Sequence, residues 1–403
     1  MHRLIRPIVG GLVAAIGMGV SIGISSLAPA GGCGGPQDPG KPAGKADGLP
    51  GGSLLGKRVV TKYTAPLKRD NGAVAEDDWF RVYTVEKVDG DRLRLSGEGI
   101  SGWVDADDVV PLDRAVAFYT REIRNAPGNA TAHLMRAYVR NELGDRARAI
   151  EDFNAAIALD PKDPTFRTAR GLFHQESKDY SKAIADFTEA IRLDPKGALA
   201  IASRADVHND AGELEKARDD YDRAIELEPR NPAHYSGRGT IWARLGEFER
   251  SLEDLNRAIE LDPKTGYSRF LRAWAHASLK DYDGALADYD EAIRLDPTDD
   301  YALRSRGWIL ATCPDPKYRD GKKAIESARK ACELTKWNES GSLSAMAAAC
   351  AEVGDFAAAV KWQTKANALY KDGDEQAAAS QRRLKLYQEK RPYHEDEDSV
   401  VDH

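Results

Sequence analysis

Three histidines in this sequence have a spacing that could place them in a row of metal ligands. His174 and His208 are 34 residues apart, and His276 follows His208 at twice that interval. If each histidine stands on its own repeated helix, helix packing separates neighbouring rings by about 8–10 Å, whereas zinc holds its nitrogen ligands at about 2 Å. We therefore expect no metal site and no cofactor.

A second motif with chemical meaning covers residues 51–57, where Gly-Gly-Ser-Leu-Leu-Gly-Lys has the G-x-x-x-x-G-K spacing of a phosphate-binding loop. Arg58 stands where a serine or threonine would hold magnesium, and no strand signal precedes the motif. The sequence also has no Ser/His/Asp or Cys/His arrangement typical of nucleophilic catalysis. We expect a protein that binds no nucleotide and is not an enzyme.

Arginine and aspartate form two further columns with the same interval of 34 residues. The arginines are Arg136, Arg170, Arg204, Arg238, Arg272 and Arg306, and the aspartates, each 16 residues after an arginine, are Asp152, Asp186, Asp220, Asp254 and Asp288. In an antiparallel helix pair that turns midway, these two positions lie at the same height, and the aspartate is also level with the arginine of the next unit. This predicts a structural Arg–Asp ladder along the array. A solvated charged surface and a direct contact to a ligand are the alternatives.

The elements that position these columns follow from six prolines at intervals of 34 residues. They are Pro127, Pro161, Pro195, Pro229, Pro263 and Pro297. With proline at position 32 of each unit, small residues recur at positions 8, 20 and 27, as at Ala137, Ala149 and Ala156. Small residues allow two helices to pack closely, and proline ends the second helix. Each unit is therefore predicted to be an antiparallel helix pair, here called helix A and helix B.

This pattern resembles the tetratricopeptide repeat family from about Asp113 to Leu369. The resemblance implies a mainly α fold: an α-solenoid over residues 113–370, made of a half repeat, six repeats and a degenerate seventh, and preceded by a small β module. Five extra residues enter the sixth repeat within Cys313–Gly321, either as a plain loop or as a partner contact. Residues 371–391 are expected to form a capping helix, and residues 392–403 a disordered acidic tail.

The resemblance also implies a binding face, because helix A lines the inner surface of such arrays. Positions 2, 5 and 9 in repeats five and six hold Tyr267, Phe270, Trp274, Tyr301, Arg304 and Trp308. Aromatic residues and arginine are typical of interaction hot spots. We expect these six residues to hold a protein or peptide segment in the concave groove; the alternative is that the rings pack only against neighbouring helices.

Residues 53–112 lack the helical period and show short β-branched and aromatic runs between turn signals, such as Val88-Asp89-Gly90-Asp91. The closing Gly102-Trp103-Val104 resembles the end of bacterial SH3-like domains. That resemblance implies a small barrel whose Trp79, Tyr83 and Trp103 contact peptide or cell-wall glycan, with the solenoid as an assembly platform. The alternative is that these rings form the core of the barrel.

The first thirty residues have the form of an export signal, with His2, Arg3 and Arg6 before an apolar stretch. Cleavage after Ala30, lipidation of Cys33 and retention as a membrane anchor all remain open. Residues 31–52 are rich in glycine and proline and predict a flexible tether. We expect an exported protein of the periplasm or cell envelope, which touches the membrane only through this terminus.

The composition excludes further classes of protein. Lys and Arg number 58 against 65 Asp and Glu, which gives a net charge of −7 with both signs spread along the chain. A nucleic-acid-binding protein usually carries a basic stripe, so we expect no such partner. Four cysteines are too few for a disulfide scaffold. A Cys313–Cys332 bridge and free thiols, including Cys350, are both compatible with the sequence.

Overall fold

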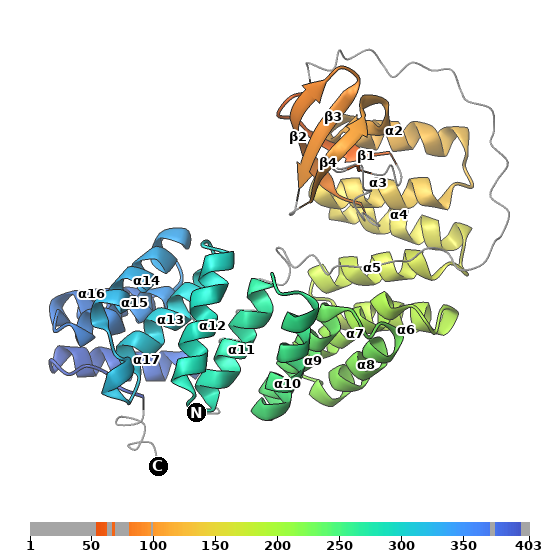
Figure 1. The fold of residues 1–403 in the computed structure, drawn as a ribbon. Coiled ribbons are helices and arrows are strands. Elements are labelled where there is room, and N and C mark those ends of the chain that lie inside the picture. The colour runs from red at the N-terminus through yellow and green to blue at the C-terminus, as the bar shows by residue number, and fades with distance from the viewer. Residues whose placement is uncertain (1–53, 63–66, 69–79, 98–99, 371–374, 396–403) are drawn as a thin grey trace. The chain divides into compact units, whose positions relative to one another are not determined.

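The computed structural model describes residues 54–62, 67–68, 80–97, 100–370 and 375–395 (Figure 1). The chain divides into an N-terminal unit that ends at Asn231 and a C-terminal unit that begins at Pro232. Sixteen α-helices and five strands lie in the described residues. Each unit is described by itself below.

The N-terminal unit begins with a five-stranded antiparallel sheet in the order β4-β3-β2-β1-β5. The strands are β1 (Arg58–Thr61), β2 (Val82–Asp89), β3 (Arg92–Gly97), β4 (Ile100–Asp105) and β5 (Val109–Pro111). Gly90, with φ +60°, makes the turn between β2 and β3 that the sequence predicts. Alternating residues such as Val59, Val85, Leu93 and Leu95 form a small core. The SH3-like assignment of this sheet stays a prediction.

The sheet and the first helices share a second core. Helix α2 (Leu112–Asn125) follows β5 directly, and its Tyr119 hydroxyl donates a hydrogen bond of 3.3 Å to the carbonyl of Thr61. Val60 of β1 packs in one cluster with Tyr119 and with Met135 of helix α3 (Ala130–Glu142). The sheet is therefore joined to the first repeat by apolar contact as well as by chain connection.

The helices alternate between A and B as the proline interval predicts. In the N-terminal unit they are α3 (Ala130–Glu142), α4 (Arg146–Leu159), α5 (Pro164–Glu176), α6 (Tyr180–Leu193), α7 (Ala198–Asp210) and α8 (Leu214–Leu227). In the C-terminal unit they are α9 (Pro232–Leu245), α10 (Phe248–Leu261), α11 (Gly266–Ser278), α12 (Tyr282–Leu295), α13 (Asp300–Thr312), α14 (Gly321–Leu334), α15 (Ser340–Glu352), α16 (Phe356–Asn367) and α17 (Glu375–Gln388). Odd-numbered helices from α3 to α15 are helix A, and the even-numbered helices from α2 to α16 are helix B.

Small residues are required where the two helices of a repeat approach each other. Ala137 and Ala149 are fully buried between α3 and α4. A Cβ atom added at Gly171 would lie 2.7 Å from the ring of Phe187, closer than van der Waals contact allows. The large ring at position 24 therefore packs directly against position 8, which must hold a small residue.

The five extra residues of the sixth repeat form a packed connection between α13 and α14. A short 3-10 helix, η3 (Pro316–Tyr318), places the Tyr318 ring 5.3 Å from Tyr282, and the Tyr318 hydroxyl donates a 2.7 Å hydrogen bond to Asp283. Arg319 forms an ion pair of 3.1 Å with Glu352 of α15. This insert thus connects repeats five and seven of the C-terminal unit.

Candidate functional site

Five of the six arginines of the predicted ladder meet the aspartate of their own repeat through two parallel hydrogen bonds. Arg170 Nε and Nη2 lie 2.8 and 2.6 Å from the two carboxylate oxygens of Asp186. The same geometry recurs, at 2.7–2.9 Å, in the pairs Arg136–Asp152, Arg204–Asp220, Arg238–Asp254 and Arg272–Asp288. All five aspartates are at most 7% exposed. A buried carboxylate needs such a partner, so these pairs occupy structural positions between helix A and helix B.

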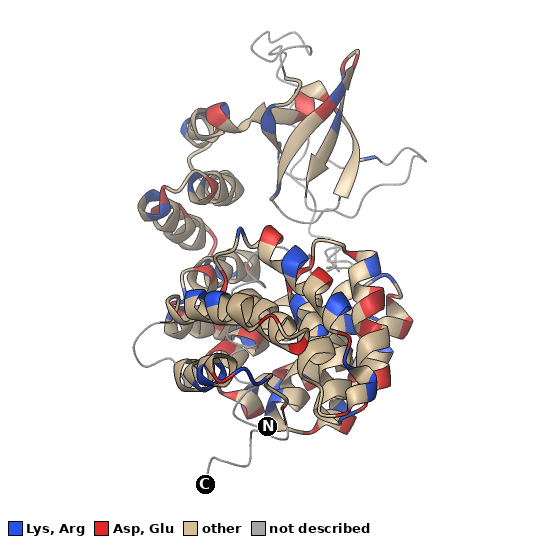
Figure 2. Ribbon diagram, turned by 90° about the vertical axis from the view of Figure 1, so that its left-hand side faces the viewer, with Lys and Arg blue, Asp and Glu red and all other residues tan. Residues whose placement is uncertain are grey.

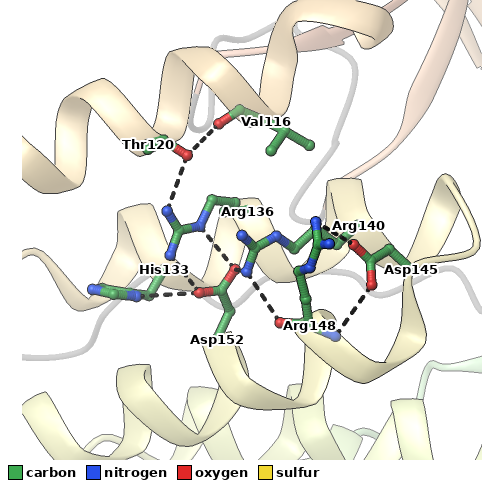
Figure 3. Close-up of polar contacts among 8 residues, drawn as sticks. All are labelled: Val116, Thr120, His133, Arg136, Arg140, Asp145, Arg148 and Asp152. Carbon is green, nitrogen blue, oxygen red and sulfur yellow. Dashed lines mark hydrogen bonds and ion pairs between the residues drawn. The ribbon is translucent and has the colours of Figure 1, made fainter.

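The third donor of the arginine reaches the preceding repeat. Arg170 Nη1 donates to the side-chain oxygen of Asn154 at 2.5 Å, and Arg136 Nη1 donates to the Thr120 hydroxyl at 3.0 Å (Figure 3). Arg204 contacts Thr188 in the same way, at 3.1 Å. The continuity between repeats therefore passes through position 25. The expected contact between an aspartate and the arginine of the next repeat does not form in these repeats. A polar residue recurs at position 25 every 34 residues, as at Thr120, Asn154 and Thr188. This recurrence is the sequence signal that could have identified the contact.

Additional donors surround the first aspartate of the array. Asp152 accepts hydrogen bonds from Arg136 and from Arg140 Nη1, the latter at 2.7 Å, and lies 3.4 Å from the ring nitrogen of His133 (Figure 3). Figure 2 shows acidic and basic residues interspersed along the described helices.

The ladder ends in the sixth repeat. Arg306 Nε lies 2.6 Å from Asp290 at position 25 of the fifth repeat, and Arg306 Nη1 donates to the Ser327 hydroxyl, also at 2.6 Å. Ser327 occupies the place of the aspartate because the insert shifts the register by five residues. In the seventh repeat the equivalent residues are Met346 and Trp362, which belong to one apolar cluster.

The three regularly spaced histidines lie beside carboxylates rather than beside one another. His174 is 4.0 Å from Asp186, His208 is 2.5 Å from Glu213, and His276 is 2.8 Å from Asp281. Burial lowers the pKa of His174, although the nearby Asp186 opposes this shift. Within the described ranges, no group of three or more His, Cys, Asp or Glu side chains is placed to hold a metal ion.

Two of the six predicted partner-binding residues, Phe270 and Trp274, are buried. Phe270 is 3% exposed and packs against Tyr289 at 5.9 Å between ring centroids. Trp274 is 7% exposed and meets Phe248 of α10 edge to face at 6.0 Å. The expectation that they face a partner needs correction, because both large rings fill space between neighbouring helices.

The other four residues, Tyr267, Tyr301, Arg304 and Trp308, are half-buried. The Arg304 guanidinium lies 4.4 Å from the centre of the Tyr301 ring and forms an ion pair of 2.9 Å with Glu339. Glu339 also accepts hydrogen bonds from the first N–H groups of α15, including that of Gly341 at 2.9 Å. Burial acts to raise the pKa of Glu339, but Arg304 and these N–H groups hold it below its usual value. We call these four residues the helix-A aromatic surface.

Trp308 contacts a segment that the sequence assigns to a disordered tail. Its Nε1 donates a hydrogen bond of 2.7 Å to the carboxylate of Glu395, and its ring lies 6.0 Å from that of Tyr393. Tyr393 and Glu395 therefore lie against α13, which differs from the expectation of a disordered segment over residues 392–403. Residues 396–403 lie outside the described residues.

The rings predicted in the sheet have separate environments. Tyr83 is fully buried in the sheet core, so the expectation that it contacts a ligand needs correction. Trp103 is half-buried, with the cations of Lys87 and Arg92 at 5.8 and 5.3 Å from its ring. Trp79 lies outside the described residues. A fourth ring, Phe80, stacks on Tyr138 of α3 at 5.3 Å, and burial raises the pKa of Tyr138.

The cysteines in the described part of the chain are free and buried, so the Cys313–Cys332 bridge is wrong. Burial raises the pKa of Cys332 to about 12 and that of Cys350 to about 11. These thiols are therefore protonated at neutral pH and act as small apolar side chains. The predicted signal, tether and Cys33 lie outside the described residues, among which no helix is long and apolar enough to span a membrane.

Comparisons with known proteins agree with the repeat geometry. The tetratricopeptide repeat family model matches residues 112–164, 168–233 and 237–300. The structure is similar to that of the APC/C hetero-tetramer Cut9-Hcn1, with 17% identity, coverage of 68% of this chain and 52% of that chain, and a TM-score of 0.53. It is also similar to yeast Tom70, with 18% identity, coverage of 69% and 58%, and a TM-score of 0.50.

At these identities the two structures show a shared fold alone. A comparison with curated protein sequences finds no match. The matched ranges run from α2 to α12, apart from residues 165–167 of α5 and 234–236 of α9, and the arginine–aspartate pairs recur within them. The chain is therefore mainly helical and carries a tetratricopeptide repeat solenoid preceded by a small antiparallel sheet.

Proposed function

We propose that this protein is an exported, non-enzymatic scaffold that holds a protein or peptide segment against helix A of its repeats. The observation that carries the proposal is the helix-A aromatic surface in the C-terminal unit. Tyr267, Tyr301 and Trp308 are neither core residues nor fully solvated. Rings with an apolar body and a polar tip are suited to recognising another chain.

The repeat architecture supports this function because it presents those rings from a rigid frame. The Arg272–Asp288 pair joins α11 to α12, the two helices of the repeat that carries Tyr267. Preorganised side chains lose little conformational entropy on binding. A chain segment that meets Tyr301 and Arg304 would therefore bind a surface that is already ordered.

Site-specific photo-crosslinking tests this proposal. Benzoylphenylalanine is placed at Tyr301 in the full chain, in cells of the organism that makes it, and matched against Glu260 on helix B, whose side chain is 65% exposed. We expect covalent adducts of defined mass from position 301 and none from position 260. Equal adduct yields at the two positions would contradict a partner surface on helix A.

Export is tested separately, because it rests on the first thirty residues alone. Residues 1–52 are fused to an alkaline phosphatase that lacks its own signal and is active only after export. We expect activity from this fusion and none from a matched fusion with Leu12→Arg and Ile16→Arg in the apolar stretch. Incorporation of labelled fatty acid that is lost with Cys33→Ser would identify lipidation.

A further inference from the structure

The chain turns sharply after α17 and crosses α13. Lys390 takes a left-handed conformation, with φ +58°, and the N–H of Arg391 donates to the carbonyl of Leu386 at 2.9 Å. This is the pattern that closes a helix C-terminus, and Pro392 prevents the helix from continuing. The following residues, 393–395, have no helix or strand of their own. They therefore lie on the repeats as a short irregular peptide.

Every residue of this short segment has a specific contact. Tyr393 packs against Trp308, and the carboxylate of Glu395 accepts the Trp308 indole hydrogen bond of 2.7 Å. The Glu395 N–H donates to the carbonyl of Thr312 at 3.1 Å. His394 Nε2 lies 2.9 Å from the carboxylate of Glu352. Trp308 thus contacts both the ring and the carboxylate of the segment, and Thr312 accepts from its backbone, as in peptide recognition.

These contacts are additional to the cap of the solenoid. The last apolar face is already covered by α17, where Tyr387 is 1% exposed within the terminal core. Ser380 of the same helix accepts a hydrogen bond of 2.6 Å from the buried Gln363 of α16. Figure 1 shows α17 beside the last helices of the C-terminal unit. Tyr393 packs against the same terminal core, whereas the polar contacts of His394 and Glu395 are additional to this cover.

Arg383 provides a second, independent observation. It is 6% exposed, and its guanidinium lies 5.3 Å from the centre of the Trp308 ring and 5.8 Å from that of Tyr393. Its buried Nε has no hydrogen-bond acceptor. A buried Nε–H group without an acceptor is costly, and an oxygen acceptor supplied from outside would lower that cost.

We propose that Trp308, Thr312, Glu352 and Arg383 form a peptide-binding site, here called the Trp308 site, which Tyr393–Glu395 occupies in cis. The partner that it takes is an extended segment with the order aromatic residue, histidine, Glu or Asp, in which the histidine meets Glu352. This inference rests on the proposed scaffold function and names one of its ligand classes. Because a tethered segment acts at an effective concentration in the millimolar range, it hides the site from weak ligands and yields to stronger ones.

Fluorescence anisotropy with a labelled peptide tests the proposal in the full chain. The probe is a fluorescein-labelled synthetic peptide with the sequence of residues 391–397. The wild-type chain is compared with a Tyr393→Ala/Glu395→Gln variant, in which the cis segment has lost its ring and its charge. We expect the variant to bind the peptide at least tenfold more tightly than the wild type. Peptides that carry the same two changes should not bind.

A matched pair of tryptophan substitutions locates the binding. In the variant background, Trp308→Phe removes the indole donor and should weaken peptide binding at least tenfold. Trp362→Phe changes a ring that stacks on Trp337 at 4.6 Å, away from the segment, and should leave binding unchanged. Equal effects of the two substitutions would overturn the assignment to Trp308.

The remaining outcomes also decide the matter. If the variant keeps its melting temperature and binds no peptide, the proposal is wrong. If the variant melts lower, restoration of that temperature by the added peptide supports the site, and no restoration overturns it. The wild type could also form dimers in a concentration-dependent way that the same two substitutions abolish. That result would show that the occupant of the site is a second copy of this chain, and it would overturn the proposed partner. Photo-crosslinks from Tyr301 without peptide binding contradict this inference alone, whereas peptide binding without crosslinks contradicts the broader helix-A surface.

Discussion

The first five repeats and the seventh repeat join their two helices by different chemistry. In the first five, a buried aspartate pairs with an arginine, as in Arg204–Asp220 at 2.7 and 2.8 Å. In the seventh, Met346 and Trp362 stand at those two positions within an apolar cluster. A bidentate ion pair is directional, whereas apolar contact is not. The comparison indicates that internal repeats use the pair to set the register of helix A on helix B.

The sixth repeat is intermediate between these two regions. Its Arg306 keeps the contact to the preceding repeat through Asp290, but meets the neutral Ser327 in its own repeat. The contact to the preceding repeat therefore persists one repeat further than the pairing with aspartate. This separates two roles of the arginine, namely joining the two helices of one repeat and joining adjacent repeats.

Removal of one buried aspartate should lower the unfolding free energy more than any other change proposed below. Asp220→Ala leaves Arg204 without its buried partner, and breaking such a pair costs about 3 kcal/mol of unfolding free energy. Urea denaturation followed by circular dichroism measures the loss. The neighbouring Asp219→Ala, at a side chain that is 65% exposed, serves as the control and should change little. An unchanged melting temperature for Asp220→Ala would exclude a stabilising ladder.

The apolar counterpart should show a smaller effect. Trp362→Ala removes a half-buried ring that stacks on Trp337 at 4.6 Å, and we expect a loss of about 2 kcal/mol from the lost contact area. Thermal melting detects this change, with Lys330→Ala on the exposed face of α14 as the control. A loss equal to that of Asp220→Ala would remove the energetic distinction between the two regions.

The contact between repeats should contribute less again. Asn154→Ala deletes the acceptor of Arg170 Nη1, and a solvent-accessible hydrogen bond of this kind is worth about 0.5–1 kcal/mol. Asn154→Thr should retain most of the stability, because threonine accepts the same contact at Thr120 and Thr188. Equal losses from the alanine and threonine variants would show that the hydrogen bond is not responsible.

Replacement of a whole pair should have the smallest effect. Arg204→Met with Asp220→Leu converts an internal repeat to the chemistry of the seventh, and the unfolding free energy should stay within about 1 kcal/mol of the wild type. Hydrogen exchange of the backbone amides in α7 and α8 then tests the register of these two helices. We expect the protection of these amides to become less uniform. A double variant as unstable as Asp220→Ala would show that the pair itself, and not the unpaired charge, carries the energy.

The periodic parts of the fold were predictable because each repeat carries its own signals. The proline interval and the small residues predict every helix pair, and the shared height of positions 7 and 23 predicts the observed pairing of Arg170 with Asp186. The burial of Phe270 and Trp274 was not predictable in the same way. Their positions face both the inner surface and the neighbouring helix, and the size of the ring decides which contact it makes.

The contacts at the C-terminus have no period to reveal them. They depend on the left-handed turn at Lys390, which only three-dimensional packing selects, and on the distance from there to Trp308. Pro392 was the one local signal, since it ends α17 and forces an extended chain. The acidic composition of the terminus instead favoured disorder, because charged residues contribute little to a core.

The third contact of each arginine has a consequence for how such an array can change its length. Asn154 and Thr188 occupy the same position in successive repeats, and both accept a hydrogen bond from the arginine that follows. Deletion of residues 155–188 would bring Arg204 beside Asn154 in place of Thr188 and leave every remaining ladder arginine with its aspartate. Gene duplication or loss in steps of 34 residues would therefore preserve every polar contact of the ladder, whereas any other step would not.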